Sequence, residues 1–391
     1  MLRSSTAFAF LLTVAHVQGD DGFRLNLLTD PSAVCLDGSP GGFYLREGVG
    51  ASASTWLIEM EGGGWCVSAA DCQARAKTDI GSSKNWPATG CPGMDGGSNG
   101  MLSNDCSTSP FCNATAVHLN YCDGASFASS RGYDEASGLQ FSGAFIFNAT
   151  FERLLSLGLG SATEVILKGC SAGGLAVYLH CDLFADMLAA TGSKARVVCM
   201  PDAGFFRMNY DTFAGKAVYT PEQQWVYSYQ NVTQMDAGCV TARTSNETWQ
   251  CFFAEENLPF ISTPLFVTQD LVDSWQMGNI LDIPCNLNAA SGPSACNSTE
   301  ISAVHDYRAS MLAALAPLTS SPTNGGYLSA CYQHCHQNIE QVWDQELVQN
   351  TTVEAAFMSW WTNACTTPRI VVDGEFGKNP HCYGTPYCRK V

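Results

Sequence analysis

The 391-residue sequence predicts an α/β fold, with a mostly parallel central sheet flanked by helices and with long disulfide-linked loops. Short apolar runs typical of buried strands alternate with segments of helical periodicity, the pattern of parallel strands joined by helices. A hydrophobic share of 46% and an aromatic share of 11% indicate a globular chain with a sizeable core. Nineteen cysteines, spread along the chain, indicate cross-links between the loops.

Seven segments carry these signals. A strand is predicted where a short apolar run stops at glycine or polar residues, and a helix where apolar residues recur every three or four positions. The predicted strands lie at 55–60, 114–122 and 163–169, and within 195–206 and 263–275; the predicted helices lie at 148–159, with Gly158 as a stop signal, and at 174–190. Loops rich in Gly, Ser, Pro, Asn and Cys separate them, most clearly at 84–106 and 284–299.

The first residues predict a secretory signal peptide. Arg3 supplies a basic start, residues 7–15 an apolar stretch, and residues 17–19 a cleavage site after small residues. Nine mostly apolar residues are too few to cross a bilayer, so an uncleaved membrane anchor is the weaker alternative. We therefore expect a signal peptide over 1–19 and one catalytic domain over 20–391, with no stable membrane insertion and an extracellular location, in the cell wall or the secretory pathway.

Two further features agree with secretion. The chain contains six Asn-x-Ser/Thr triplets that could carry sugar, at Asn113, Asn148, Asn231, Asn246, Asn297 and Asn350. Its cysteine usage suits an oxidising compartment better than the cytosol. Because nineteen is an odd number, at least one thiol is left without an intramolecular partner; Cys170 is the candidate, since it lies in a turn expected to be buried.

The charge balance is strongly acidic. Nineteen Lys and Arg residues stand against 36 Asp and Glu, a formal net charge of −17. Removal of the signal peptide takes away Arg3 and no acid, which leaves 18 against 36, or −18. This balance disfavours nucleic acid and anionic membranes as partners. We expect a monomer.

A candidate nucleophile follows the strand at 163–169. The sequence "GCSAG" (169–173) matches G-x-S-x-G, and it lies where that motif requires, between a strand and a helix. The sharp turn strains the serine backbone and needs tiny neighbours, while the helix amino terminus favours negative charge at the exposed hydroxyl. The alternative is a glycine-rich turn with a passive serine. The context favours Ser171 as a nucleophile.

A serine nucleophile needs a general base. In α/β-hydrolase order the base follows the acid late in the chain, which leaves four histidines: His305, His334, His336 and His381. Two of them lie in "CYQHCHQN" (331–338), where a disulfide could pin the loop that carries the base. The same cysteines and histidines resemble zinc ligands, but an oxidising compartment and the lack of a second ligand cluster make a metal site the weaker interpretation.

The acid and the oxyanion donors follow from the same logic. Three aspartates come after strand-like runs and could orient the imidazole, Asp202, Asp270 and Asp273, and the spacing does not choose among them. The amide after the nucleophile, that of Ala172, is one expected oxyanion donor. A glycine-rich loop after an early strand normally supplies the others, and Gly62–Gly64 of "EGGGWC" is the obvious loop.

Taken together, these segments resemble the pectin acetylesterase family, which includes Notum-type carboxylesterases, and the resemblance is nearer to the plant type. The segments that carry it run in the family's order from about Ala33 to Cys382: "AVCLDGSPGGFYL", "WLIEMEGGGWC", "NYCDGASF", "GCSAGG", "DAGFF", "VDSWQ", "CYQHC" and "NPHC". The resemblance implies an α/β-hydrolase-like fold and a serine triad that needs neither a metal nor an organic cofactor.

Carried over position by position, the resemblance implies a role for each site residue. Ser171 corresponds to the nucleophile, Asp273 to the acid and His334 to the base, and the backbone amides of Gly64, Trp65 and Ala172 correspond to the oxyanion donors. Asp202 then becomes a structural residue that orders the loop after its strand. One position departs from the plant pattern, because His336 stands after "HC" where those members usually carry glutamine.

We therefore expect a secreted serine carboxylesterase that removes O-acetyl groups from a cell-wall-type, pectin-like polysaccharide through an acyl-enzyme. The acidic surface fits poorly with a polyanion such as pectin, and a neutral acetylated glycan would remove that conflict. One alternative is a Notum-like deacylase that removes a fatty acyl group from a protein, which would need a deep apolar pocket beside Ser171. The other is a catalytically inactive glycan-binding relative.

Overall fold

The computed structural model describes residues 22–90, 100–287, 295–364 and 366–382. The predicted signal peptide lies outside these residues. A nine-stranded sheet runs through the described chain in the order β1-β2-β4-β3-β7-β8-β9-β10-β11, with a small hairpin, β5-β6, beside it. The strands are β1 Arg24–Leu27, β2 Gly42–Arg46, β3 Thr55–Met60, β4 Thr115–Leu119, β5 Gly132–Asp134, β6 Leu139–Phe141, β7 Glu164–Cys170, β8 Arg196–Asp202, β9 Phe266–Asp270, β10 Gly325–Ser329 and β11 Ile370–Val372.

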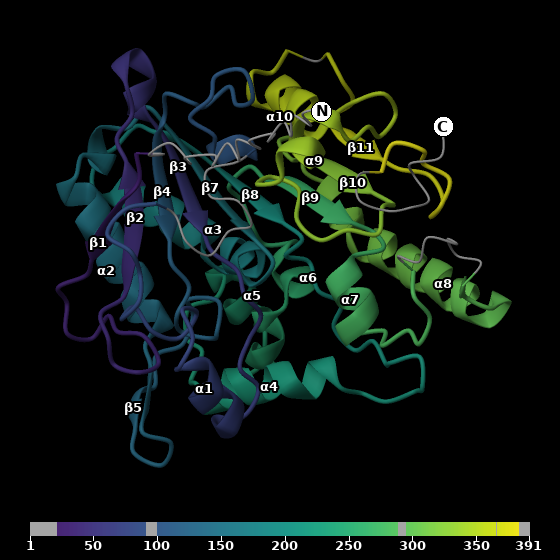
Figure 1. Ribbon diagram of the computed structural model, residues 1–391, viewed down its shortest axis with the longest axis horizontal. Helices are drawn as coiled ribbons and strands as arrows, with labels where there is room; N and C mark the ends of the chain where they lie inside the picture. The colour runs from purple at the N-terminus through teal and green to yellow at the C-terminus, as the bar shows by residue number, and fades with distance from the viewer. Residues whose placement is uncertain (1–21, 91–99, 288–294, 365, 383–391) are drawn as a thin grey trace, which may run out of the picture.

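All pairings from β4 to β11 are parallel, whereas β1 and β2 add an antiparallel edge. The helices of the described chain are α1 Ala69–Arg75, α2 Gly143–Ser156, α3 Ala172–Ala190, α4 Tyr219–Tyr229, α5 Ala237–Thr241, α6 Ala254–Asn257, α7 Ser274–Asn279, α8 Ser298–Ala314, α9 Glu340–Gln345 and α10 Val353–Trp361. The predicted α/β fold with a mostly parallel sheet is confirmed (Figure 1).

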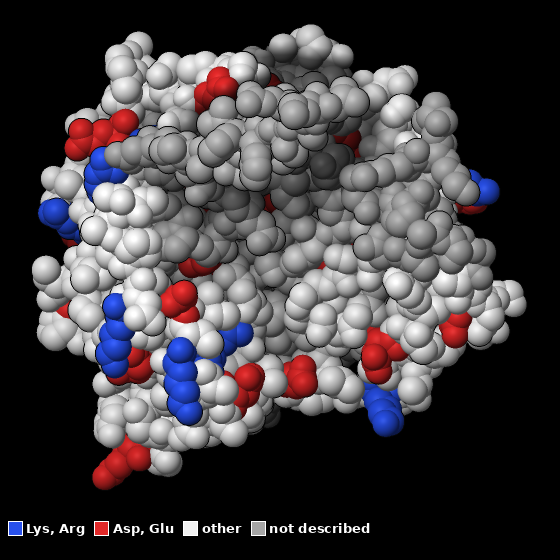
Figure 2. Space-filling model, viewed as in Figure 1, with Lys and Arg blue, Asp and Glu red and all other residues white. Residues whose placement is uncertain are grey.

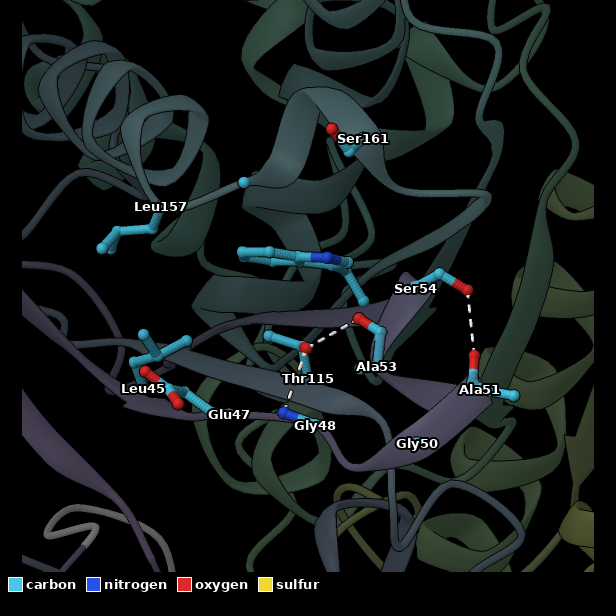
Figure 3. Close-up of a pocket in the computed structure, with 12 residues that line it drawn as sticks. Leu45, Glu47, Gly48, Gly50, Ala51, Ala53, Ser54, Thr115, Leu157 and Ser161 are labelled. Carbon is cyan, nitrogen blue, oxygen red and sulfur yellow. Dashed lines mark hydrogen bonds between the residues drawn. The ribbon is translucent and has the colours of Figure 1, made fainter.

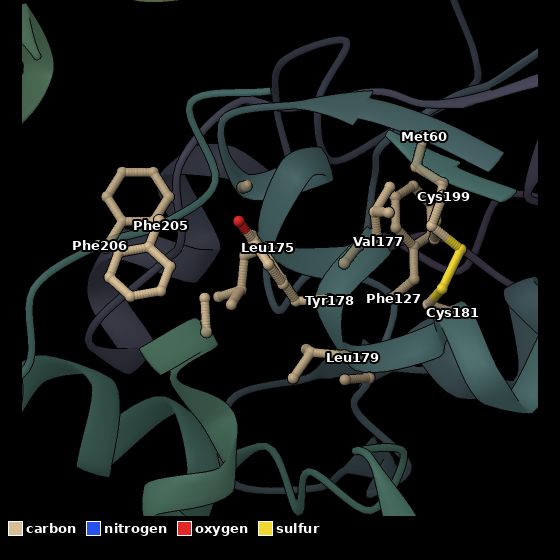
Figure 4. Packing of buried hydrophobic residues seen from close by; sticks show 14 of the residues in the cluster. Met60, Phe127, Leu175, Val177, Tyr178, Leu179, Cys181, Cys199, Phe205 and Phe206 are labelled. Carbon is tan, nitrogen blue, oxygen red and sulfur yellow. A yellow bond between two sulfur atoms is a disulfide. The ribbon is translucent and has the colours of Figure 1, made fainter. Parts of the chain in front are cut away.

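Helices cover both faces of the sheet, which explains why its central strands are continuous apolar runs. Alternate residues of a strand point to opposite faces. On one face Ile58 and Leu167 belong to a core cluster with residues of α2 and α3, while on the other Leu57 and Ile166 pack in a cluster with residues of α9 and α10. Figure 4 shows the first cluster around α3, with Tyr178 near the Phe205 ring.

The predicted elements form where the sequence placed them, with small shifts at their ends. The helix predicted at 148–159 begins earlier, at Gly143, and ends at Ser156 before Gly158, which has a φ of 110°. The helix predicted at 174–190 begins two residues earlier, directly after Ser171. Among the described helices, none is long and apolar enough to cross a membrane.

Eight disulfides cross-link the described residues, as the cysteine usage predicts. They pair Cys35–Cys122, Cys66–Cys72, Cys106–Cys112, Cys170–Cys335, Cys181–Cys199, Cys239–Cys251, Cys285–Cys296 and Cys331–Cys382. The expectation that Cys170 is the unpaired thiol is wrong, because Cys335 approaches from the loop after β10 and bonds to it. The other three cysteines, Cys91, Cys365 and Cys388, lie outside the described residues.

Candidate active site

Four parallel strands end at one edge of the sheet, and each delivers a candidate residue there. β3 leads into the loop Gly62–Trp65, β7 into Ser171, β9 into Asp273 and β10 into the loop of His334. The sheet contains these four strands in the consecutive order β3-β7-β8-β9-β10, with β8 as the one additional strand among them. The carboxyl edge of an open parallel sheet is where such folds place their ligand sites.

Ser171 occupies the sharp turn between β7 and α3. Its φ of 61° and ψ of −125° are a strained conformation for a residue with a side chain. The turn is held from both sides, because the Ser171 amide donates to the Asp202 carbonyl at 2.9 Å and the Ser171 carbonyl accepts from the Leu175 amide at 2.9 Å. Ser171 lies at the first turn of α3, whose amide groups favour negative charge nearby.

The glycines around Ser171 are required by close backbone contacts. A Cβ atom on Gly173 would lie 2.0 Å from the Met60 carbonyl oxygen, and one on Gly174 would lie 2.4 Å from the Asp202 carbonyl oxygen. Both distances are far inside van der Waals contact, so α3 packs against β3 and β8 only with glycine at these two positions. This explains the small residues of the "GCSAGG" segment in physical terms.

Asp273 and His334 form a hydrogen-bonded pair. The Asp273 carboxylate is fully buried, and its Oδ2 lies 2.7 Å from Nδ1 of His334. Its other oxygen caps α7 by accepting from the Gln276 amide at 2.9 Å, which fixes the carboxylate. Within the described residues Nε2 of His334 has no hydrogen-bond partner. The pair therefore leaves one ring nitrogen available to a reacting group.

The environment of His334 favours its protonated form. Burial by itself lowers the pKa of His334, but the negative charge and hydrogen bond of Asp273 outweigh burial, so that the pKa is raised above the ordinary 6.5. Asp202 and Asp270 contribute in the same direction at longer range. Such a base accepts a proton readily and releases it as the acid at the next step.

The other two candidate acids are paired elsewhere. Asp202 and Asp270 hold the fully buried His336, whose Nδ1 lies 3.0 Å from Asp202 and whose Nε2 lies 3.2 Å from Asp270. Asp202 also accepts the backbone amides of His336 at 2.6 Å and Gln337 at 2.8 Å. Asp202 therefore anchors the loop after β10.

The remaining histidine candidates take no part in the Asp273 pair. His305 lies on α8, and His381 is exposed near the end of the described chain. His336 is sealed between its two aspartates, with no exposed surface. Of the four late histidines, His334 is the one that the structure brings to Asp273.

A disulfide joins the nucleophile turn to the loop of the histidine. Cys170 precedes Ser171, Cys335 follows His334, and their bond connects two parts of the chain 165 residues apart. One ring nitrogen of His334 lies within 4.8 Å of the sulfurs of both cysteines, which places the imidazole at the turn. Cys331 is bonded to Cys382, so the prediction that a disulfide pins this loop is confirmed. The sulfurs considered as zinc ligands are thus engaged in disulfides.

The glycine loop after β3 runs directly beside Ser171. A Cβ atom on Gly62 would lie 2.4 Å from the Cys170 carbonyl oxygen and 3.0 Å from Cβ of Ser171. Gly64 has a φ of 67°, and its carbonyl accepts a hydrogen bond of 2.7 Å from the Tyr121 hydroxyl. Because C=O and N–H of a trans peptide point in opposite directions, this bond turns the Trp65 amide away from Tyr121.

Two residues that the sequence did not single out support this loop. The Ser126 hydroxyl accepts from Nε1 of Trp65 at 2.8 Å and donates to the Ala172 carbonyl at 2.8 Å, so it bridges the glycine loop and α3. The Ser126 amide donates to the Tyr121 hydroxyl at 3.1 Å. In the described residues the backbone amides of Gly64, Trp65 and Ala172 have no hydrogen-bond acceptor. Three unengaged donors therefore lie near Ser171.

A buried charged network lies behind the turn. Lys168, within β7, contacts Glu59 of β3 at 2.9 Å and Asn338 at 2.7 Å, and all three side chains are buried. Although burial opposes ionisation, Lys168 and His118 lower the pKa of Glu59 to about 2. Sequence reasoning missed this network. A lysine inside the apolar run "VILKG" was the signal that could have revealed it.

A cleft of about 480 Å³ opens beside the glycine loop. Its walls come from the loop Gly63–Trp65, from α1, from α4 and from α7, three helices that lie on the same side of the sheet in Figure 1. A second cavity of about 450 Å³ lies at the other end of the parallel strands, beside the amino ends of β3 and β4 (Figure 3). The second cavity is separated from Ser171 by the length of the strands, and we do not assign it to the site.

Comparison with known proteins agrees with this geometry. The family model described as Pectinacetylesterase matches residues 18–383. The chain belongs to the pectinacetylesterase family. Pectin acetylesterase 5 of Arabidopsis thaliana is 34% identical over 369 residues, 90% of this chain and 82% of that protein. The palmitoleoyl-protein carboxylesterase NOTUM of Homo sapiens is 32% identical over 269 residues, 66% of this chain and 53% of that protein. The expected nearness to the plant type is confirmed.

A solved structure supports the fold. The Wnt deacylase Notum from Drosophila superposes with a TM-score of 0.79 at 23% identity, covering 92% of this chain and 99% of the other. The expected α/β-hydrolase-like fold is therefore confirmed. As a member of the pectinacetylesterase family, the protein is a carboxylic ester hydrolase.

Proposed function

We propose that the protein is a secreted serine esterase that removes O-acetyl groups from a polysaccharide, with Ser171 as nucleophile, His334 as base and Asp273 as its partner. The observation that carries the proposal is the 2.7 Å pair of Asp273 and His334, whose imidazole has one ring nitrogen within 4.8 Å of the sulfurs of the disulfide next to Ser171. Family membership supplies the reaction class. The names of the plant relatives point to acetyl groups on pectin.

The first half-reaction forms an acetyl-enzyme. The Ser171 hydroxyl oxygen attacks the acetyl carbonyl carbon while Nε2 of His334 takes its proton, and Asp273 stabilises the resulting imidazolium. The amides of Gly64, Trp65 and Ala172 donate to the oxyanion. The bond from carbon to the sugar oxygen then breaks, and that oxygen takes the proton from His334.

The second half-reaction releases acetate. A water molecule loses its proton to His334 and attacks the acetyl carbonyl carbon, and the same three amides hold the new oxyanion. The bond to Ser171 breaks, and the proton on His334 returns to the serine oxygen. Besides the ester and one water molecule, each step uses only groups of this chain, and the enzyme ends in its starting state.

Aromatic packing beside the triad favours a short acyl group. The Trp65 ring packs edge-on against Phe206 with centroids 4.9 Å apart and against Trp275 at 5.8 Å, and Phe206 contacts Trp275 at 5.2 Å. The Phe206 ring also lies 6.4 Å from that of His334. These rings fill the space next to the base. We infer that an acetyl group fits beside them and that a long fatty chain requires them to move.

Secretion is part of the same proposal. Eight disulfides in the described residues fit an oxidising compartment. The predicted signal peptide, cleaved after residue 19, would deliver the protein there.

Hydrolysis of p-nitrophenyl esters from acetate to palmitate tests the proposal. We expect the secreted wild-type protein to be fastest with acetate, and we expect Ser171→Ala to lower kcat by about 10⁴-fold or more. Exposed Ser161 lies at the far end of the strands (Figure 3), and Ser161→Ala is the matched control that should keep full activity. A maximum at long chains would favour the protein deacylase, and a Ser171→Ala variant as active as wild type would overturn the mechanism.

A further inference from the structure

The cleft beside the glycine loop is the surface next to the reacting ester. It is lined at one end by Gly63, Gly64 and Trp65, and Gly62 of the same loop lies against Ser171, which places the cleft next to the nucleophile turn. The remaining walls are the end of α1 at Arg75, the face of α4 around Glu222, and the end of α7 that leads to Asp282. The volume of about 480 Å³ is of the size that holds a few sugar rings.

The walls of the cleft combine aromatic rings with hydroxyl-binding groups. The half-buried Trp275 lines the cleft, backed by the buried Tyr219, and the two rings contact each other with centroids 6.1 Å apart. Asn279 is exposed at the rim and offers an amide that can both donate and accept. Apolar ring faces beside neutral polar groups suit the C–H faces and hydroxyls of a sugar.

The charges that line the cleft are mostly negative. Two carboxylates face it, Glu222 and Asp282, against one guanidinium, Arg75. Arg75 is already engaged, since its Nη2 donates to the Gly63 carbonyl at 2.8 Å and its guanidinium lies 5.9 Å from the Tyr121 ring centroid. Lys216 is exposed on the neighbouring loop and does not line the cleft.

The cleft already disfavours the negative charge of its own residue Glu222. Burial raises the pKa of Glu222, and the nearby Asp71 raises it further. Asp71 is held at the cleft wall, because its Oδ2 accepts from the amide of Val67, a cleft residue, at 2.9 Å. A uronate carboxylate bound here would face these acids, with the Arg75 guanidinium as the one cation among the lining residues. Like charges brought together in a partly desolvated site repel each other.

We propose that the cleft selects an uncharged acetylated glycan and discriminates against the free carboxylates of a uronate polymer through Glu222 and Asp282. This inference rests on the proposed esterase function. The shared chemistry is a sugar ring without net charge next to the acetyl group. A neutral acetylated polymer provides it, and so does an acetylated galacturonan whose carboxyls are methyl esters.

Acetate release from three polymers of equal acetyl content tests the proposal. These are acetylated xylan, a methyl-esterified acetylated galacturonan, and the same galacturonan after treatment with a pectin methylesterase. At low salt we expect kcat/KM for the methyl-esterified polymer to exceed that for the demethylated one by about tenfold, and we expect the gap to narrow in about 0.5 M NaCl. Acetate release from both xylan and the methyl-esterified galacturonan would identify neutral polymers in general as substrates. Release from the methyl-esterified galacturonan alone would identify that polymer as the substrate.

Charge-neutralising variants link the effect to the cleft. We expect Glu222→Gln and Asp282→Asn each to raise kcat/KM on the demethylated polymer, and so to reduce the difference between the two galacturonans several-fold. Glu152→Gln on α2 is the matched control, since Glu152 is exposed and does not line the cleft. Glu152→Gln should leave the ratio of kcat/KM between the two galacturonans at its wild-type value.

Three outcomes would overturn the inference while the esterase function stands. They are equal rates on both galacturonans, faster release from the demethylated one, or hydrolysis of p-nitrophenyl acetate without acetate release from any polymer. Faster acetate release from an O-acetylated polymer of cationic glucosamine than from acetylated xylan would also overturn the inference, in favour of a cation-selective cleft. Loss of the esterase function itself would appear separately, as Ser171-independent hydrolysis of p-nitrophenyl acetate.

Discussion

At the scale of single residues, the two oxygens of Asp273 have separate roles. One caps α7 and the other holds Nδ1 of His334, which keeps the proton on Nδ1 and leaves Nε2 as the base. In Asp273→Asn the amide oxygen can keep the cap, but the NH₂ group would face Nδ1 and favour the wrong tautomer. We expect kcat on p-nitrophenyl acetate to fall by about 10⁴-fold, with the melting temperature nearly unchanged. A variant with more than a tenth of wild-type kcat would contradict this role.

The pH dependence of the reaction follows from His334. The base must be neutral to take the Ser171 proton, and Asp273 raises the pKa of His334 above 6.5 in spite of burial. Activity should therefore be present above that raised pKa and fall as pH decreases through it. We expect the acid limb of the profile of kcat/KM to have its midpoint above 6.5. A profile that stays flat down to pH 5 would point to a different base.

At this scale the sequence predicts local geometry and leaves spatial pairing open. The turn that holds Ser171 was predictable because its glycines, the strand before it and the helix after it are neighbours in sequence. Asp202, Asp270 and Asp273 follow neighbouring strands and look alike in sequence; the choice depends on which imidazole each one meets. That pairing is a property of the folded loop after β10, and family resemblance supplied the choice before the structure did.

At the scale of elements, the Cys170–Cys335 disulfide connects the strand that carries the nucleophile to the loop that carries the base. Replacing both cysteines by serine removes the disulfide that links these two loops in the described part of the chain. We expect kcat to fall by 10- to about 100-fold, because a shift of about 1 Å between base and nucleophile is costly, and the free energy of unfolding to fall by about 2–5 kcal/mol. Steady-state kinetics and urea unfolding measure the two effects.

A second disulfide provides the control for that experiment. Cys239–Cys251 links α5 to a short helical turn 12 residues later, and neither cysteine belongs to the site. Its double serine variant should lose stability while kcat remains close to wild type. Equal kcat in both double variants would show that the Cys170–Cys335 bond has no role in positioning His334.

Two strands that the sequence did not predict, β10 and β1, lack a long apolar run for different physical reasons. β10 reads "GGYLS", and its two glycines pack against Phe266 and Leu318 where larger side chains would not fit, so the strand lacks an apolar run. β1 is an edge strand with exposed Arg24 and Leu27 and therefore lacks the pattern of a buried strand. The strands β3, β7, β8 and β9 were predictable because both of their faces are covered by helices.

At the scale of the whole molecule, buried ionisable groups determine how stability responds to pH. Burial raises the pKa of Glu61 and of Asp123 to about 7, so that both hold a proton in the native state at a pH where the unfolded chain has lost it. Their contribution therefore decreases as pH rises from about 4 to about 7. His180 acts in the opposite direction, because burial lowers its pKa to about 4. Between pH 4 and 7 we therefore expect the two acids to lower the free energy of unfolding by more than His180 raises it.

Two further buried groups, His336 and Glu59, change the stability at higher and at lower pH. Burial opposes the charge on His336, yet Asp270 and Asp202 raise its pKa well above 6.5, so its contribution is present at acid pH and is lost as pH rises through the raised value. Below pH 4 the sign reverses. The pKa of Glu59 is lowered to about 2, so its contribution is present above its ordinary pKa of 4.5 and is lost as pH falls toward 2.

We therefore expect maximal stability near pH 4 to 5 and a steady decrease toward pH 8, where the formal charge of −17 adds repulsion. Figure 2 shows acidic side chains spread over one face of the molecule, intermingled with basic ones, so this repulsion is not confined to one patch. The urea midpoint measured from pH 3 to 8 checks the curve. In Asp123→Asn the Asn oxygen can still accept the Ala125 and Phe127 amides that Asp123 now holds at 3.0 and 3.1 Å, so the fold should persist and the slope between pH 5 and 7 should become shallower. A midpoint that is higher at pH 8 than at pH 5 would show that the buried carboxyls are ionised in the native state.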